Sequence, residues 1–318
     1  MSQMFRILVV RLGSMGDVIH ALPAVASLKH SFPHSRLSWV IKPRWAPLLE
    51  GNPFVDEIIP FNRSAREILA TRRNLRRERF ELAVDLQGLI QSALVAASAR
   101  ADKIVGLART QARESFAAMF YSTAVRTSAL HRVDRYLELV SAAGASNLLR
   151  TFPLPPGRPE GTLPERPFVL ACPLAGWGAK QWPLGHYAEL AGRLNIPLVV
   201  NGPPDAAEIL GRIDGAHVHL SGIQGLIDAT RRAQAIVGVD SGPVHLAAAL
   251  GKPGVAIYGP TDPASHGPYG GTLQVLRSSS AVTSYKRRAA DAGSMRAVSP
   301  AEVVEALNEV LKKTTGCL

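Results

Sequence analysis

The sequence predicts an α/β protein with two domains, each built on a parallel β-sheet. Short apolar segments alternate with longer segments of helical period, the alternation stops once at a Pro-rich stretch, and it then resumes. The chain has 318 residues, of which 47% are hydrophobic, and this exceeds the size at which a single core usually stops growing. We therefore expect two separate cores.

Ten apolar segments bounded by turn residues are predicted to be strands. Five precede the Pro-rich stretch, at residues 6–10, 37–41, 56–61, 81–86 and 102–107. Five follow it, at residues 168–173, 197–202, 217–222, 235–239 and 254–259. Because helical segments separate successive strands, crossover connections are expected, and these are typical of parallel sheets covered by helices.

The stretch LPPGRPEGTLPERP at residues 154–167 marks the domain boundary, since proline can neither continue a helix nor donate to a strand ladder. We predict an N-terminal domain at residues 1–155 and a C-terminal domain at residues 156–298. The final segment, residues 299–318, begins with Ser299, Pro300 and Glu302 in the pattern of a capped helix.

The formal net charge of +11 indicates an acidic partner, which could be a nucleic acid, an anionic membrane or a phosphorylated substrate. The two cysteines, Cys172 and Cys317, are too few for a disulfide framework or a zinc site, which favours a reducing compartment. The N-terminus lacks the pattern of a secretory signal, and no uncharged apolar run approaches the length of a membrane span. We expect a cytoplasmic protein that contacts a membrane without crossing it.

The loop RLGSMGD, residues 11–17, follows the first predicted strand. Gly13 and Gly16 allow a sharp turn at the carboxyl end of that strand, where α/β sheets present ligand-binding groups. The spacing matches neither a dinucleotide fingerprint nor a P-loop. Asp17 could cap the following helix or accept a proton from a substrate.

A second loop, CPLAGWGAKQWP, places Lys180 after Gly176 and Gly178. A lysine there can meet a diphosphate as a point charge, and the alternative is a surface lysine on an open loop. The flanking Trp177 and Trp182 favour a loop that lines or closes a site.

The motif DSGPVH follows the strand predicted at residues 235–239. Ser241 and Gly242 offer a hydroxyl and backbone N–H groups at a helix start, an arrangement that prefers phosphate. The charge of Asp240 would repel phosphate, so we expect it to orient the turn or a partner side chain. His245 could contact the ligand or lie in the core. No set of His, Cys and Asp has metal-ligand spacing, so no metal is expected.

Four motifs follow one another along the chain: RLGSMGDVIHALPA at 11–24, KQWP at 180–183, VDSGPVHLAAALG at 239–251 and YGPTDP at 258–263. With them the chain resembles the ADP-heptose:lipopolysaccharide heptosyltransferases of glycosyltransferase family 9. The segments GLARTQARESFAAMFY at 106–121 and HRVDRY at 131–136 look most like heptosyltransferase I, which adds the first heptose to the Kdo sugar of the inner core.

The resemblance implies a GT-B fold, with two Rossmann-like domains facing across a cleft and a last helix that packs back on the N-terminal domain. It implies inverting transfer of heptose from ADP-heptose to the Kdo of Kdo2-lipid A, without a metal or other cofactor. Asp17 matches the general base, and Lys180 a catalytic residue that stabilises the departing diphosphate. The implied donor-binding residues are Gly13, Gly16, Lys180, Asp205, Asp240, Ser241, Gly242 and His245.

The ribose contact of the donor is implied to be an acidic residue in NGPPDAAE at 201–208, either Asp205 or Glu208. Ala206 and Ala207 stand where other members often have Glu. Basic positions that would face the phosphorylated, Kdo-bearing acceptor are Arg63, Arg66, Arg113 and Arg135. The implied location is the cytoplasmic face of the inner membrane, in peripheral contact with anionic lipid.

Three alternatives stay open. The chain could be a heptosyltransferase II or another member of family 9, a nucleotide-sensing protein on the same fold, or a basic nucleic-acid-binding protein. Only 6% of its residues are aromatic, and no RNP-like strand or helix-turn-helix motif is recognisable. We therefore expect no nucleic-acid partner.

Overall fold

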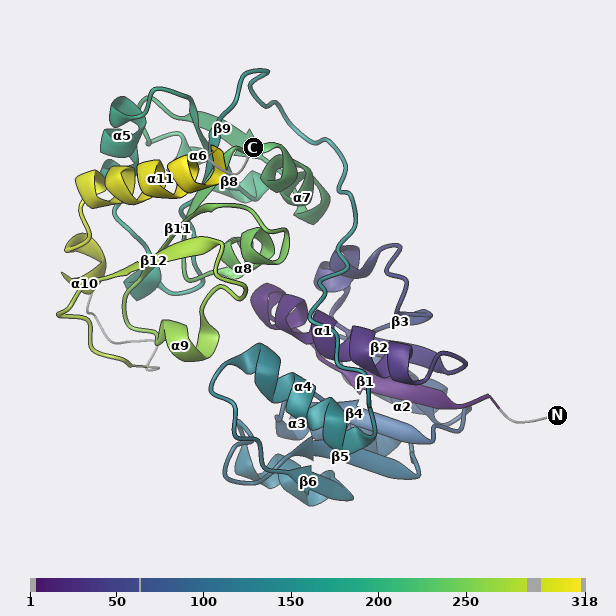
Figure 1. The fold of residues 1–318 in the computed structure, drawn as a ribbon. Coiled ribbons are helices and arrows are strands. Elements are labelled where there is room, and N and C mark those ends of the chain that lie inside the picture. The colour runs from purple at the N-terminus through teal and green to yellow at the C-terminus, as the bar shows by residue number, and fades with distance from the viewer. Residues whose placement is uncertain (1–3, 63, 285–292, 316–318) are drawn as a thin grey trace. The chain divides into compact units, whose positions relative to one another are not determined.

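The computed structural model describes residues 4–62, 64–284 and 293–315 (Figure 1). The chain divides into two compact units, Met1–Pro155 and Pro156–Leu318. The division falls inside the Pro-rich stretch, and each unit contains one sheet of six parallel strands flanked by helices.

The first unit has the strand order β3-β2-β1-β4-β5-β6, with every neighbouring pair parallel. Its strands are β1 Arg6–Val10, β2 Arg36–Ile41, β3 Glu57–Pro60, β4 Leu82–Asp85, β5 Lys103–Leu107 and β6 Thr123–Val125. The chain moves outward from β1 to β3 and then returns to place β4 on the other side of β1. The carboxyl ends of β1 and β4 therefore form a topological switch point, where α/β sheets bind ligands.

Helices connect these strands and cover the sheet (Figure 1). They are α1 Met15–Ser31, η1 Pro43–Leu49, α2 Ala65–Leu75, α3 Ile90–Ser98, η2 Ser115–Phe120 and α4 Arg132–Ala143, where η marks a 3₁₀ helix. Helix α1 packs against α4, and Ile7 through Val10 of β1 are fully buried. Such burial explains why this strand is a continuous apolar run instead of an alternating one.

The second unit repeats this plan with the strand order β12-β11-β10-β7-β8-β9, again parallel throughout. Its strands are β7 Val169–Cys172, β8 Leu198–Gly202, β9 His217–Leu220, β10 Ala235–Val239, β11 Gly254–Tyr258 and β12 Leu273–Arg277. Its helices are η3 Gly178–Lys180, α5 Leu184–Arg193, η4 Pro204–Ala206, α6 Ala207–Leu210, α7 Ile223–Arg232, α8 Gly242–Ala249, α9 Pro263–His266, α10 Gly293–Arg296 and α11 Pro300–Thr315. The switch point here lies between β7 and β10.

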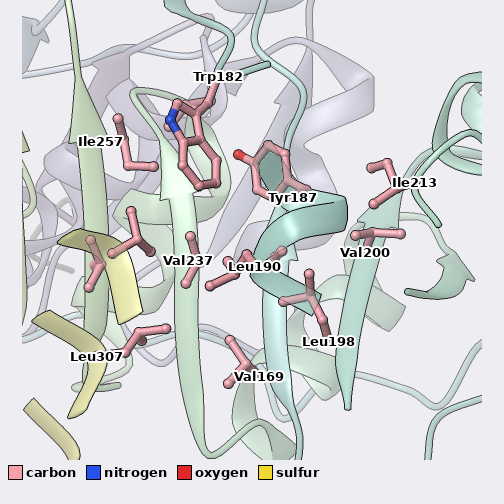
Figure 2. Packing of buried hydrophobic residues seen from close by; sticks show 14 of the residues in the cluster. Val169, Trp182, Tyr187, Leu190, Leu198, Val200, Ile213, Val237, Ile257 and Leu307 are labelled. Carbon is pink, nitrogen blue, oxygen red and sulfur yellow. The ribbon is translucent and has the colours of Figure 1, made fainter. Parts of the chain in front are cut away.

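The core of the second unit gathers around Trp182 and Tyr187, whose ring centroids lie 4.8 Å apart in an edge-to-face arrangement (Figure 2). Both are buried among aliphatic side chains of the sheet, and Leu307 of α11 belongs to the same cluster. The Trp182 Nε1 donates to the Val298 carbonyl at 2.8 Å, which fixes the chain just before α11.

The last helix differs from the expectation. Helix α11 packs on α5, β11 and β12, all within the second unit, and was expected to pack on the N-terminal domain (Figure 1). The reason is its apolar face, because Val303 and Leu307 are completely buried in the core of the second unit. Its predicted start is confirmed: the Ser299 N–H donates to Glu302 Oε2 at 2.7 Å and the Glu302 N–H to Ser299 Oγ at 3.3 Å.

All ten predicted strands are present, but the edge strands β6 and β12 were not predicted. Each lies at one edge of its sheet and is only partly buried, so it lacks the long apolar run of the inner strands.

Candidate functional site

The loop after β1 holds a fixed ion pair. Arg11 directly follows the strand, and its Nη2 lies 2.5 Å from Oδ1 of Asp17 in the first turn of α1. The Arg11 side chain is 3% exposed and that of Asp17 is 22% exposed, so the pair lies at the rim of the sheet with the carboxylate toward solvent. The position is the β1/β4 switch point.

Ser14 fixes the other oxygen of Asp17. Oδ2 accepts from the Ser14 N–H at 3.0 Å and from the Ser14 hydroxyl at 2.9 Å. Asp17 is therefore part of the capping box of α1, and its carboxylate remains partly accessible.

Burial alone would raise the pKa of the Asp17 carboxyl. The charges of Arg11, Arg132 and His20, together with the Ser14 N–H, outweigh burial and hold this pKa well below its usual range. Asp17 is thus an ionised hydrogen-bond acceptor at neutral pH.

The neighbouring loop after β4 supports Arg11. Arg11 Nη1 donates to the Leu86 carbonyl at 3.0 Å, and its guanidinium lies 5.7 Å from the Tyr136 ring centroid. Gln87 Oε1 accepts from the Leu12 N–H at 2.8 Å. These contacts join the two loops of the switch point into one rigid base for Asp17.

Gly13 is required by the packing of this loop. Its φ is +137°, and a Cβ at this position would lie 2.4 Å from Nε1 of Trp45. Gly16 lies buried in the first turn of α1. Both glycines, which the resemblance assigns to donor binding, belong to the first unit and shape the loop around Asp17; the other residues assigned to the donor belong to the second unit.

In the second unit, the β7/β10 switch point brings Lys180 and Asp240 together. Lys180 follows β7 in the chain and Asp240 directly follows β10, and Nζ lies 2.5 Å from Oδ2. The ammonium also lies 4.4 Å from the centroid of the Trp177 ring. The lysine is therefore held by a carboxylate and an aromatic face instead of extending from an open loop.

Asp240 organises this site. The Thr261 hydroxyl donates to its Oδ2 at 2.5 Å, and His245 Nε2 lies 3.8 Å from its Oδ1. Burial would raise the pKa of Asp240, but His245 and Lys180 outweigh it and hold the pKa well below its usual range. As expected from its charge, Asp240 contacts partner side chains.

The start of α8 presents polar groups beside this cluster. Ser241 is the N-cap, and its buried hydroxyl has no hydrogen-bond partner among the described residues. Pro243 has no N–H, and the Val244 N–H donates to the Ser241 carbonyl at 3.2 Å. The Gly242 N–H and the Ser241 hydroxyl are therefore the groups at this helix end that fit an anion.

The remaining predicted residues are less closely gathered. Asp205 is exposed in η4, after β8 and at the same edge of the sheet as Asp240, whereas Glu208 pairs with Arg212 at 2.5 Å. Arg135 donates to the Ala129 carbonyl at 3.1 Å. Arg66 and Arg113 are exposed, on α2 and in the loop before η2 respectively, and Arg63 lies outside the described residues.

Several functional features were missed or misjudged. No function was assigned from the sequence to Arg11, which pairs with Asp17, or to Thr261, which donates to Asp240, although each lies within a motif at the end of a strand. The two tryptophans near Lys180 were expected to line a site together, but Trp182 is 1% exposed and belongs to the core. Only Trp177 contacts Lys180.

A cavity of about 550 Å³ is lined by residues of α5 and α11 and contains none of the residues above. A cavity of about 420 Å³ lies at the carboxyl ends of β2 and β3. Among residues 4–62, 64–284 and 293–315, no three His, Cys, Asp or Glu side chains form a group that could hold a metal ion. No helix within the same ranges has the length and apolar character needed to span a membrane.

The chain is similar to known proteins along most of its length. Residues 68–293 match the profile of Glycosyltransferase family 9 (heptosyltransferase). The chain is 30% identical to lipopolysaccharide heptosyltransferase 1 of Pseudomonas aeruginosa, with 83% of this chain and 81% of that protein covered. It is also 30% identical to lipopolysaccharide heptosyltransferase 2 of Escherichia coli K12, with 96% of this chain and 98% of that protein covered.

Solved structures support the same relationship. The E. coli heptosyltransferase WaaC with ADP superimposes with a TM-score of 0.78 at 25% identity, with 96% of this chain and 100% of that chain covered. E. coli ADP-heptose lps heptosyltransferase II gives a TM-score of 0.78 at 26% identity, with 98% and 100% covered. The two parallel sheets are thus those of a GT-B fold, and the chain is a glycosyltransferase that belongs to family 9, the family of the lipopolysaccharide heptosyltransferases.

Proposed function

We propose that this glycosyltransferase transfers heptose from ADP-heptose to the Kdo of Kdo2-lipid A, with inversion at the anomeric carbon. The observation that carries the proposal is the ionised Asp17 carboxylate, fixed by Arg11 and Ser14 at the β1/β4 switch point. The relatives named heptosyltransferase 1 support the first-heptose acceptor. The WaaC structures with ADP and with ADP-2-deoxy-2-fluoro heptose support an ADP-sugar donor.

Asp17 acts as the general base. Its low pKa makes it a weak base toward a free hydroxyl, so the proton moves only as the acceptor oxygen bonds to the anomeric carbon and becomes acidic. The proton passes to Asp17 while the bond between that carbon and the diphosphate oxygen breaks. Attack from the face opposite the leaving ADP inverts the configuration.

The second unit stabilises the departing diphosphate. An ammonium has three N–H donors, and Asp240 accepts from one of those of Lys180, so others remain for phosphate oxygens. The Ser241 hydroxyl and the Gly242 N–H add donors at the start of α8, and His245 adds a ring in its first turn. Asp240 holds Lys180 in place, and Asp205 is our choice for the ribose contact because Glu208 is paired with Arg212.

Heptosyltransferase II activity is the second candidate. The relatives named heptosyltransferase 2 are 28–30% identical and cover 96–97% of this chain, whereas those named heptosyltransferase 1 cover 83–86% of it. The two activities differ in the acceptor, which ends in Kdo for the first and already carries one heptose for the second. Comparing turnover of these two acceptors decides between them.

We also propose that the enzyme works at the cytoplasmic face of the inner membrane, in peripheral contact with anionic lipid. The exposed basic side chains at the end of α2 and just after it support this placement, and they are Arg72, Arg73, Arg76 and Arg77. Cosedimentation with phosphatidylglycerol vesicles should fall when these four are changed to Gln. Binding that is unaffected by the change would contradict the role of this surface.

A further inference from the structure

The cavity of about 420 Å³ in the first unit has a basic lining. Its walls are formed by Lys42, Pro43, Arg44, Phe61 and Asn62. Lys42 follows the end of β2 and Phe61 follows the end of β3, so the cavity lies at the same edge of the sheet as the Asp17 loop. Two lining residues carry positive charge and none carries negative charge. The cavity therefore fits an anionic group.

Trp45 and Lys42 connect this cavity to the loop that carries Asp17. The Arg44 guanidinium lies 4.5 Å from the centroid of the Trp45 ring, and the same indole packs so closely on Gly13 that no Cβ fits there. The Lys42 N–H donates to the Leu12 carbonyl at 3.3 Å. A ligand bound in the cavity is thus connected to the proposed catalytic loop directly through Lys42 and indirectly through Arg44 and Trp45.

Arg44 is suited to recognise an oxyanion. Among residues 4–62, 64–284 and 293–315 its guanidinium has no ion pair or hydrogen bond, and its contact is the Trp45 ring. The contact with the indole holds the guanidinium near the cavity and leaves N–H groups for a carboxylate or phosphate, which arginine can bind with two parallel hydrogen bonds. Phe61 is 1% exposed and contributes an apolar wall, which strengthens such contacts by excluding water.

We propose that Lys42 and Arg44 form an anion-binding subsite for the acceptor, which holds a carboxylate or phosphate while Asp17 takes the proton from the attacking hydroxyl. This inference rests on the function proposed above and adds a site to it. The ligand belongs to the acceptor because Lys42 and Trp45 connect the cavity to the loop that carries Asp17 in the first unit, and the residues proposed for the donor diphosphate lie in the second.

Steady-state kinetics with Kdo2-lipid A test the subsite. Arg44→Ala should raise KM for the acceptor roughly tenfold, as expected for the loss of a charge-assisted pair, and leave KM for ADP-heptose and kcat unchanged. Arg44→Lys should have an acceptor KM between those of the native enzyme and Arg44→Ala, because lysine keeps the positive charge but cannot form a bidentate pair. The double variant Lys42→Ala/Arg44→Ala should have a higher acceptor KM than Lys42→Ala or Arg44→Ala alone. Arg79→Ala is the control, since Arg79 is exposed and pairs with Asp102 at 3.1 Å, away from the cavity.

An acceptor without the lipid A phosphates identifies the anion. If a phosphate occupies the cavity, the dephosphorylated acceptor should bind the native enzyme as weakly as the intact acceptor binds Arg44→Ala. If a Kdo carboxylate occupies it, the difference between native and Arg44→Ala should persist with the dephosphorylated acceptor. An acceptor KM that is unchanged in the double variant overturns the subsite.

Calorimetric titration with free Kdo and with inorganic phosphate separates this proposal from the proposed function. The titration needs no turnover, so it can be read even if the enzyme transfers no heptose to Kdo2-lipid A. Weaker binding of either anion to the double variant than to the native protein supports the subsite. Equal affinity, or no binding to the native protein, contradicts it.

Discussion

Lys180 and Asp240 join the loop after β7 to the loop after β10, with 2.5 Å between Nζ and Oδ2. The two residues are 60 positions apart in the chain, and they meet because their strands are neighbours at the switch point of the second sheet. The pair is mostly buried, and Thr261 and His245 complete the surroundings of its carboxylate.

Lys180→Met should damage both stability and turnover, because it leaves a buried carboxylate without its cation. We expect a loss of about 3 kcal/mol in the free energy of unfolding, as for other broken buried pairs, measured by urea denaturation. Adding Asp240→Asn removes the uncompensated charge and should restore most of this stability. It should not restore kcat if Lys180 contacts the diphosphate, and recovery of turnover in the double variant would show that Lys180 is only structural.

Asp17→Asn should lower kcat by about 10²- to 10⁴-fold, the usual contribution of a general base. The amide oxygen can still accept from Ser14, but the buried Arg11 guanidinium loses its ion-pair partner, so the melting temperature should fall while ADP still binds in calorimetry. Asp56→Asn is the matched control, because Asp56 also accepts from a backbone N–H and pairs with a lysine, but it lies at the amino end of β3. Near-native turnover of Asp17→Asn would remove the assignment of the base.

Arg11→Met should make activity sensitive to acid. Because the pKa of Asp17 lies below its usual range, its ionisation stabilises the native fold at neutral pH, and this contribution is lost only as the pH falls below that range. Without Arg11, the largest influence that opposes burial is gone and the pKa of Asp17 rises, so the acid limb of kcat/KM should move to higher pH. Arg36→Met, which breaks the exposed pair with Glu57, should leave the profile unchanged. Coincident profiles for Arg11→Met and the native enzyme would show that Arg11 does not control Asp17.

Gly13→Ala should disturb the catalytic loop, since its Cβ would overlap the Trp45 indole. We expect destabilisation of about 1–3 kcal/mol from overpacking, and a lower kcat because Ser14 and Asp17 shift with the loop. Gly51→Ala is the control: Gly51 has φ +66° with open space around its Cβ position, so that variant shows backbone strain alone. Equal losses of stability in the two variants would exclude the Trp45 contact as the cause.

The inner strands of both sheets could be predicted because each is a buried apolar run that ends in turn residues, as β1 and β10 are. The capping box at Ser299 was also readable, because its residues are neighbours in the sequence. The surface against which α11 packs could not be predicted, because an apolar helix face does not specify which core buries it.

The same distinction holds for the site. Asp17, Lys180 and Ser241 follow predicted strands in the chain, so strand order brings each of them to the carboxyl edge of its own sheet. The pairing of Arg11 with Asp17 is set by a loop conformation, and that of Asp240 with Thr261 by two strands adjacent in space. Neither of these two pairings produces a pattern that can be recognised in a single sequence. The core position of Trp182 likewise depends on the Val298 carbonyl, far along the chain.

The central claim is tested most directly by ADP release when the purified protein is mixed with ADP-heptose and Kdo2-lipid A, with acceptor-free and heptosylated-acceptor controls. We predict release that requires the Kdo-terminated acceptor and is lost in Asp17→Asn. Release only with the heptosylated acceptor would contradict first-heptose transfer and identify the second-heptose activity. No release with either acceptor, despite calorimetric binding of ADP, would contradict both.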